Sequence, residues 1–388
     1  MAELRIAYVI NSVEGGGAAL PVPAVARALI AQGARLEVFA LTRRDGRALS
    51  AMETAGLTVH VRPGGEKDHR KALAWLDAQL RDWRPDVIWT SLTRATLLGQ
   101  IAGKRLAVPV VSWQHAAKLK LANLLLLHLR QAHSRLWVGD SHSVTELTAE
   151  RLDVPPSRLV AWPLFAANPD IYRAYPWRPG QTLELGSLGR LHPVKGYDIL
   201  IEALLRLQAQ GCCLPAAIRV RIAGEGRARA ALEERVERHG LSFIEFTGFN
   251  DRPLEFLADL HLYLQPSRSE GLCIAAHEAM QAGLPVIASS VGELPYSIEN
   301  GVTGLTVPPG DPWALAEALG RLLSRPERLA QMGAAARARV FQRFGQEAFD
   351  RTGAAIYRRL PGIIAEAAEA AEPSGPRRSL GLGQSACR

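Results

Sequence analysis

The feature that most constrains this fold is an alternation, repeated twice, of short β-branched runs with longer amphipathic segments. In the first half, runs such as RIAYVIN, DVIWTSL and PVVSWQH each border a stretch of helical periodicity. A second series begins with LELGSLGR and continues through IRVRIAG, FIEFTG, LHLYLQPS, LPVIASS and GLTVPP. Such alternation predicts parallel sheets covered by helices, with ligand-binding loops at the carboxyl ends of the strands. We therefore expect an α/β chain of two such domains facing one another across a cleft.

The expected domain boundary lies in residues 162–180, WPLFAANPDIYRAYPWRPG, where proline and aromatic residues interrupt the periodic pattern. We place an N-terminal domain at residues 1–170 and a C-terminal domain at residues 171–364, whose last helices are expected to pack back on the first. From residue 365 the chain reads AEAAEAAEPSGPRRSLGLGQSACR, which holds few large apolar residues. Residues 365–388 are therefore predicted to form a disordered tail.

The termini and the cysteines indicate where the protein works. The start, MAELRIAYVIN, is typical of a first strand and lacks the pattern of a signal peptide. No apolar run reaches the ~20 residues that cross a bilayer. The four cysteines show no C-x-x-C spacing, so neither a disulfide framework nor a zinc site is predicted. A reducing, cytoplasmic location is expected.

Positive charge is concentrated in the first half of the chain. Residues 1–177 hold 22 Lys and Arg against 15 Asp and Glu, whereas residues 178–388 hold 24 against 23. Such an excess suits nucleic acid, an anionic membrane surface or a phosphorylated substrate, or serves solubility alone. Residues 116–137 join many leucines to four cations, as expected of either a sheet-covering helix or a helix at an anionic membrane surface. These cations are Lys118, Lys120, Arg130 and Arg135.

Two carboxylates stand in an apolar segment, SEGLCIAAHEAMQAGLP, at residues 269–285. An ionised carboxylate is kept in such a setting only when it has a partner. Glu270 lies in a loop before a predicted helix, and Glu278 lies about two turns into that helix. The amides of Gly271 and Leu272 would bind phosphate, while the glutamates would bind ribose and sugar hydroxyls. Alternatively, both glutamates are structural, and the helix dipole stabilises Glu270 by ~0.3–1 kcal/mol.

A basic loop follows the first strand of the second half. GSLGRLHPVKGYDILIEAL places Arg190 and Lys195 where they could neutralise a diphosphate, or where they are simply solvated cations. The loop IAGEGRARAALEE carries Gly224 and Gly226 but lacks the G-x-G-x-x-G spacing of a dinucleotide site. The sequence therefore favours a phosphate site without a dinucleotide cofactor.

The first half contributes a glycine-rich loop and a histidine. In NSVEGGGAAL, Gly16 and Gly17 let the backbone approach a ligand closely, although such loops are common in α/β folds. His115 ends the predicted strand PVVSWQH, where ligand-binding loops begin, although a lone histidine is more often structural or exposed.

Together these motifs resemble the retaining glycosyltransferases of family 4, which have the GT-B fold of two Rossmann-like domains facing a central cleft. The resemblance covers nearly the whole chain. The matching segments are Gly189-Arg190-Leu191 with Lys195-Gly196, Gly224-Glu225-Gly226, Thr247-Gly248-Phe249, and Glu270-Gly271 with Glu278-Ala279-Met280. It implies an acceptor-binding N-terminal domain and a C-terminal domain that binds a nucleotide diphosphate sugar.

The resemblance also implies roles for individual residues. Glu278 would bind the donor ribose, and Glu270 would contact the transferred sugar beside His115. Arg190 and Lys195 would hold the diphosphate. The remaining donor contacts would come from Gly16, Gly17, Gly224, Gly248, Phe249, Gly271 and Leu272.

Two segments depart from the family pattern, so their contacts are not carried over. Residues 163–168, PLFAAN, stand where the family has P-N-G-(V/I)-D. Residues 291–295, VGELP, replace the glycine pair that usually precedes a P-E-(L/I/V) segment.

The resulting prediction is retaining transfer of a hexosyl unit from a UDP- or GDP-linked sugar to a hydroxyl acceptor. Many family members act on lipid-linked saccharides of bacterial surface polysaccharide or lipopolysaccharide, at the inner face of the plasma membrane. No Asp-x-Asp cluster is present, so neither a metal nor a cofactor is expected, and no nucleic-acid partner is predicted. The alternatives are a nucleotide-sugar epimerase or phosphorylase on the same fold, or a non-catalytic protein that binds a nucleotide sugar.

Overall fold

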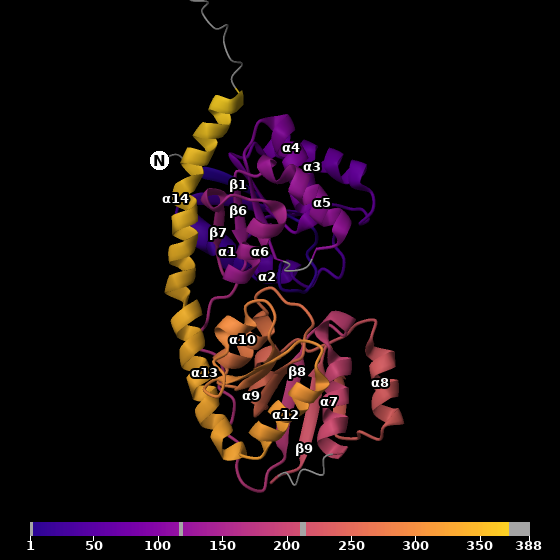
Figure 1. Cartoon of the computed structure of the whole chain (residues 1–388). Helices are drawn as coiled ribbons and strands as arrows, with labels where there is room; N and C mark the ends of the chain where they lie inside the picture. The colour runs from indigo at the N-terminus through magenta and orange to yellow at the C-terminus, as the bar shows by residue number, and fades with distance from the viewer. Residues whose placement is uncertain (1–2, 116–118, 210–214, 372–388) are drawn as a thin grey trace, which may run out of the picture.

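The computed structural model describes residues 3–115, 119–209 and 215–371, and it contains two parallel sheets stacked one above the other (Figure 1). Each sheet is covered by helices on both faces, which is the two-domain arrangement of the GT-B fold. The predicted fold class is confirmed.

The N-terminal sheet has seven strands in the order β3-β2-β1-β4-β5-β6-β7. Its central strands are buried on both faces because helices cover both sides. The strands are β1 (Leu4–Ile10), β2 (Ala34–Ala40), β3 (Val59–Val61), β4 (Val87–Ser91), β5 (Val110–Gln114), β6 (Leu136–Gly139) and β7 (Leu159–Ala161). The helices are α1 (Val22–Ile30), α2 (Leu49–Thr54), α3 (His69–Trp83), α4 (Thr93–Leu106), α5 (Leu121–Arg130) and α6 (His142–Leu152), with short turns η1 (Gln131–His133) and η2 (Pro156–Arg158).

The C-terminal sheet has six strands in the order β10-β9-β8-β11-β12-β13. These strands are β8 (Leu183–Leu188), β9 (Ile218–Ala223), β10 (Ile244–Gly248), β11 (Leu262–Gln265), β12 (Val286–Ser289) and β13 (Gly304–Val307). The helical elements are η3 (Pro193–Lys195), α7 (Tyr197–Ala209), α8 (Arg229–Arg238), α9 (Pro253–Ala258), α10 (Ile274–Gln281), α11 (Leu294–Ser297), α12 (Pro312–Leu323) and η4 (Pro326–Arg328). In both sheets the strand order reverses beside the first strand, which opens a crevice at the strands' carboxyl ends.

Two consecutive helices, α13 (Leu329–Phe344) and α14 (Gln346–Ala371), join the domains along one side (Figure 1). The helix α14 packs against α1 of the N-terminal domain. There the indole Nε1 of Trp162 donates a hydrogen bond to the carbonyl of Phe349 at 3.1 Å. A single hydrophobic core includes residues of both sheets and of α14, so the domains are not packed independently.

Two boundaries differ from the sequence-based expectation. The helix α14 continues to Ala371, so the chain is still helical at residues 365–371, where the tail was predicted to begin. Alanine and glutamate, which dominate these positions, are strong helix formers. In the segment 116–137, α5 ends at Arg130 and the chain has entered β6 by Leu136. Lys118 and residues 372–388 lie outside the described residues.

The length and polarity of the helices decide whether any of them could cross a membrane. Within the described residues, every helix is too short or too polar to span a bilayer.

Candidate active site

An ion pair joins two loops of the C-terminal domain at the carboxyl ends of its strands. Lys195 Nζ, at the end of η3, lies 2.7 Å from Glu270 Oε1, in the loop between β11 and α10. The same oxygen accepts hydrogen bonds from Gln265 Nε2 at 3.1 Å and Ser267 Oγ at 2.5 Å. The thiol of Cys273 is a further hydrogen-bond partner of this carboxylate.

Charge pairing governs the titration of Lys195. Burial alone would lower the pKa of this amine, but attraction to Glu270, with smaller contributions from Cys273 and Tyr197, raises the pKa above its ordinary value. Lys195 is therefore a fixed positive charge at neutral pH.

Glu278 is the second carboxylate, on the helix α10. It is partly buried, and no hydrogen bond or ion pair joins it to another described residue. Burial raises the pKa of Glu278 to about 7. This side chain thus retains unused hydrogen-bonding capacity and is close to half-ionised at neutral pH.

The start of α10 faces the N-terminal domain. A Cβ atom at Gly271 would lie 2.6 Å from the carbonyl oxygen of His115 and 3.3 Å from the carboxylate of Asp140. Leu272 is buried, so only its backbone can meet a ligand. The amides of Gly271 and Leu272, which directly precede the N-cap of α10, make no hydrogen bonds to other described residues.

Two glycines hold the loop that carries Arg190. Gly224, at φ 150°, and Gly226, at φ 157°, pack against the carbonyls of Gly189 and Leu191, where any side chain would overlap the backbone. Arg190 itself is exposed, and no ion pair or hydrogen bond engages its side chain within the described chain. The glycines are therefore required by loop packing, and the loop presents an unpaired guanidinium.

His115 follows β5 and belongs to a polar group formed by neighbouring strand ends. Its Nε2 lies 2.7 Å from Ser91 Oγ, and its Nδ1 lies 3.8 Å from Asp140 Oδ2. Burial raises the pKa of Asp140. Sequence reasoning missed Asp140, although it directly follows a strand in WVGD and the strand-end argument applied to His115 also holds for it.

The first loop and Phe249 form further contacts across the domain boundary. A Cβ atom at Gly17 would lie 3.6 Å from Ile274 of α10, whereas one at Gly16 would meet open space. Phe249 follows Gly248, which has φ 79°, and the guanidinium of Arg47 lies 3.7 Å from the centre of its ring. The sequence contained no signal for this cation–π pair.

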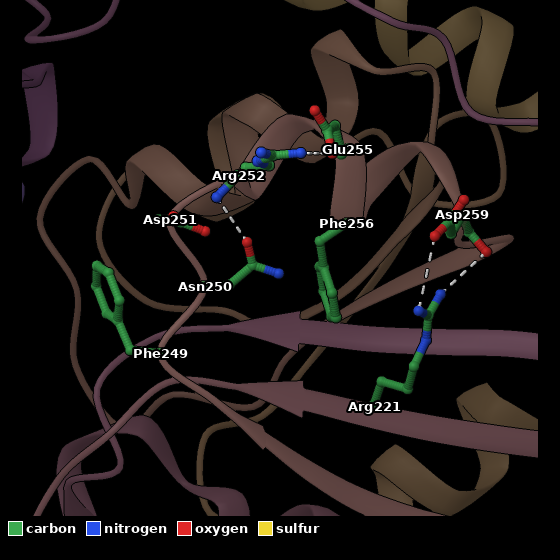
Figure 2. Close-up of a pocket in the computed structure, with 8 residues that line it drawn as sticks. All are labelled: Arg221, Phe249, Asn250, Asp251, Arg252, Glu255, Phe256 and Asp259. Atoms are coloured by element: carbon green, nitrogen blue, oxygen red, sulfur yellow. Dashed lines mark hydrogen bonds and ion pairs between the residues drawn. The ribbon is translucent and has the colours of Figure 1, made fainter.

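A hollow of about 330 Å³ lies beside Phe249 on the C-terminal domain. Figure 2 shows its charged groups turned toward one another, with Arg221 directed at Asp259 and Arg252 at Glu255. None of the predicted catalytic residues lines it. We therefore place the candidate active site at the Lys195–Glu270 pair and not in this hollow.

The structure brings part of the predicted site into direct contact. Lys195 contacts Glu270, and Gly271 approaches His115 across the cleft. Arg190 and Glu278 have no direct hydrogen bond to that group in the described residues. Across residues 3–115, 119–209 and 215–371, no three His, Cys, Asp or Glu side chains are placed to hold a metal ion.

The chain is similar to known glycosyltransferases along most of its length. Residues 173–339 match the family model of glycosyl transferases group 1, and residues 15–165 match that of glycosyltransferase family 4. D-inositol 3-phosphate glycosyltransferase of Streptomyces griseus is 27% identical, over 89% of this chain and 84% of that protein. The putative colanic acid biosynthesis glycosyltransferase WcaL of Salmonella typhimurium is 35% identical, over 46% of this chain and 45% of that protein.

Among solved structures, Anabaena HepE in complex with UDP and glucose superposes with a TM-score of 0.76 at 20% identity, covering 93% of this chain and 100% of that one. The two matched segments and the paired parallel sheets define a glycosyltransferase of the GT-B fold. The chain belongs to glycosyltransferase family 4.

Proposed function

We propose that this protein transfers a hexosyl unit, with retention of anomeric configuration, from a UDP- or GDP-linked sugar to a hydroxyl group of a saccharide. The observation that carries the proposal is Glu278, a partly buried carboxyl group that has no partner in the described chain. A ribose diol supplies two O–H donors for such a carboxylate. That HepE is bound by UDP supports a uridine nucleotide as the first donor to test.

The leaving diphosphate is assigned to the cations and the helix terminus. Arg190 provides an unpaired guanidinium, and Lys195 provides a charge held in place by Glu270. The amides of Gly271 and Leu272 would donate to the same phosphates. These groups stabilise the charge that develops as the glycosidic bond breaks, so we propose catalysis without a metal ion.

Glu270 is proposed to orient the transferred sugar. Lys195, Gln265 and Ser267 all donate to Oε1, and Oε2 is proposed to accept a sugar hydroxyl. His115 of the N-terminal domain would complete the site from across the cleft.

The proposed acceptor is a lipid-linked saccharide used at the inner face of the plasma membrane. WcaL is named for colanic acid biosynthesis, which supports a saccharide acceptor. D-inositol 3-phosphate, named in the other relative, is the small phosphorylated acceptor to compare with it.

The test measures donor binding first and turnover second. A thermal-shift series with UDP-, GDP- and ADP-sugars identifies the donor, and release of the nucleotide is then measured with and without each acceptor, in the presence of EDTA. We expect acceptor-dependent release that EDTA does not inhibit, and an α-linked product from an α-linked donor. Binding without release would indicate a sensor, and sugar rearrangement or phosphorolysis without an alcohol acceptor would indicate an epimerase or a phosphorylase.

A further inference from the structure

The helix α5 presents an apolar face to solvent. Leu121 is 71% exposed, Leu125 54% and Leu129 77%, and their spacing of four residues places them on one side of the helix. Leu126, at 46% exposure, extends the same face. We call these four leucines the leucine face. A helix that only covers a sheet would carry polar residues there.

The opposite side of α5 already provides the packing that the domain needs. Leu127 is fully buried, and it lies in a small core with Trp137, Leu152 and Val154. Figure 1 places α5 on the side of the domain away from α14, so neither long connecting helix covers the leucine face. The exposed leucines are therefore not explained by packing within the chain.

The surroundings of α5 carry uncompensated positive charge. Residues 87–139 contain seven Lys and Arg and no Asp or Glu. Lys104 and Lys120 are exposed, Arg130 is partly exposed, and none of the three is ion-paired with a described residue. Burial, Arg130 and Lys104 together lower the pKa of His133, so Arg130 and Lys104 both act on this histidine.

We propose that the leucine face, together with Lys104, Lys120 and Arg130, docks on the anionic lipid surface of a membrane. The leucines would enter the layer below the headgroups, and the cations would meet lipid phosphates. A second copy of the chain is a poorer occupant, because a two-fold contact at this face would bring the same cations of both copies together. Docking on a membrane would not depend on which nucleotide sugar is the donor.

Docking in this way would orient the cleft. The helix α5 follows β5, whose end carries His115, so the leucine face and the proposed acceptor side belong to the same part of the N-terminal domain. Attachment through a few cations and one short apolar face is expected to be reversible and sensitive to salt.

The experiment is co-sedimentation of the full chain with vesicles of phosphatidylcholine alone or of phosphatidylcholine mixed with phosphatidylglycerol, at low and at high salt. We expect wild type to bind the mixed vesicles at low salt and to be released at high salt. In K104Q/K120Q/R130Q, affinity should fall on the order of 100-fold, because each of the three cations contributes about fivefold near an anionic surface. L121Q/L125Q/L129Q should also lose binding, while keeping the far-UV spectrum and thermal midpoint of a folded protein.

Two matched variants serve as controls. R70Q/K71Q/R81Q removes three cations from α3, and Y296Q/V302Q removes exposed apolar groups from the C-terminal domain; both should bind vesicles as wild type does. Equal binding by wild type and the leucine variant, or no binding of wild type to anionic vesicles, would overturn the proposal. So would a wild-type dimer that the leucine substitutions dissociate. UDP affinity, measured in the same samples, tests the proposed function separately.

Discussion

At the scale of single residues, Glu270 and Glu278 lie on adjacent parts of one segment but have opposite environments. Oε1 of Glu270 accepts three hydrogen bonds and the Cys273 thiol is a further partner of this carboxylate, whereas Glu278 receives no donor from the described chain. A carboxyl group left without donors in a desolvated position favours its protonated form. The two glutamates should therefore respond differently to pH and to substitution.

Glu278→Gln is expected to weaken binding of the donor nucleotide roughly 10- to 100-fold, because a hydrogen bond to a charged group contributes about 1.5–3 kcal/mol. The wild-type affinity should also fall as pH drops below about 7, where the free protein protonates this carboxyl group. Calorimetric titration of UDP across this pH range measures both effects. The variant should show a flatter pH dependence.

The control for this change is Glu317→Gln, on an exposed position of α12. It should leave both the affinity and its pH dependence unaltered. Equal affinities for wild type and Glu278→Gln would contradict the ribose assignment.

His277, next to Glu278 in sequence, is expected to make the fold sensitive to acid. Its ring is fully buried and contacts the carbonyl of Cys273 at 3.0 Å and Ser297 Oγ at 2.8 Å. Burial lowers the pKa of His277 to about 4, whereas an unfolded histidine titrates near ~6.5. The unfolded chain then binds the extra proton between these values, so the free energy of unfolding should decrease by up to about 3 kcal/mol as pH falls through this window.

Urea titrations at several pH values measure this loss. In His277→Gln the slope of stability against pH should be shallower between pH 6.5 and pH 4. His239→Gln, at the exposed end of α8, should keep the wild-type slope. If the slopes of wild type and His277→Gln coincide, His277 is not the titrating group.

Much of the candidate site could be located from sequence because its residues lie in short motifs at strand ends. The β–loop–α pattern places Lys195 and Glu270 on neighbouring loops, and the structure joins them. The convergence of three donors on one oxygen of Glu270 depends on side-chain orientation, which no motif specifies. The contact of Arg47 with Phe249 joins residues from different domains, so it too required the tertiary structure.

At the scale of elements, α14 contains two glycines in contrasting surroundings. A Cβ atom at Gly353 would lie 2.7 Å from the ring of Trp162, whereas one at Gly362 would meet nothing within 4 Å. In an open helical position, Gly→Ala stabilises by roughly 0.5–1 kcal/mol. Gly362→Ala should therefore raise the free energy of unfolding by that amount.

Gly353→Ala is expected to lower the free energy of unfolding instead, by about 1–3 kcal/mol, because the new methyl group overpacks a rigid ring. Urea denaturation of both variants gives the comparison within one helix. If both substitutions raised the free energy of unfolding, α14 would be able to shift away from Trp162 without loss of stability, which would contradict the prediction.

The length of α14 illustrates how far element boundaries could be predicted. Composition indicated a tail from residue 365 because large apolar residues become rare there. Local helix propensity continues the helix through residues 365–371, although many of these side chains face solvent. Hydrophobic periodicity detects a helix only where it packs, which is why the end of this one was missed.

At the scale of the whole molecule, the two domains touch beside the proposed active site. The carboxylate of Glu293 in the C-terminal domain accepts a hydrogen bond from the Ser143 amide of the N-terminal domain at 3.2 Å and pairs with Arg343 at 3.0 Å. Gly271 approaches the carbonyl of His115 in the same region. The position of one domain on the other therefore depends on a close backbone contact.

Gly271→Ala should hold the domains apart while retaining the backbone amide proposed to bind phosphate. Turnover is expected to fall on the order of 10²-fold, because misplacement by about 1 Å has this effect on aligned groups. UDP affinity should change much less. Small-angle X-ray scattering should report a larger radius of gyration in the nucleotide-bound variant.

Gly65→Ala is the matched control, because a Cβ atom there meets nothing within 4 Å. It should match wild type in turnover and in scattering. Unchanged turnover and radius of gyration in Gly271→Ala would contradict the proposed close approach.

The connecting helix also determines when the first domain can be completed during synthesis. The surface formed by α1 and Trp162 is covered by α14, which leaves the ribosome only after both sheets have been synthesised. Until residues 346–371 emerge, the nascent N-terminal domain exposes part of the core that it later shares with the C-terminal domain. Translation of both sheets must therefore precede native packing of α1, and the intermediate is a natural client for chaperones.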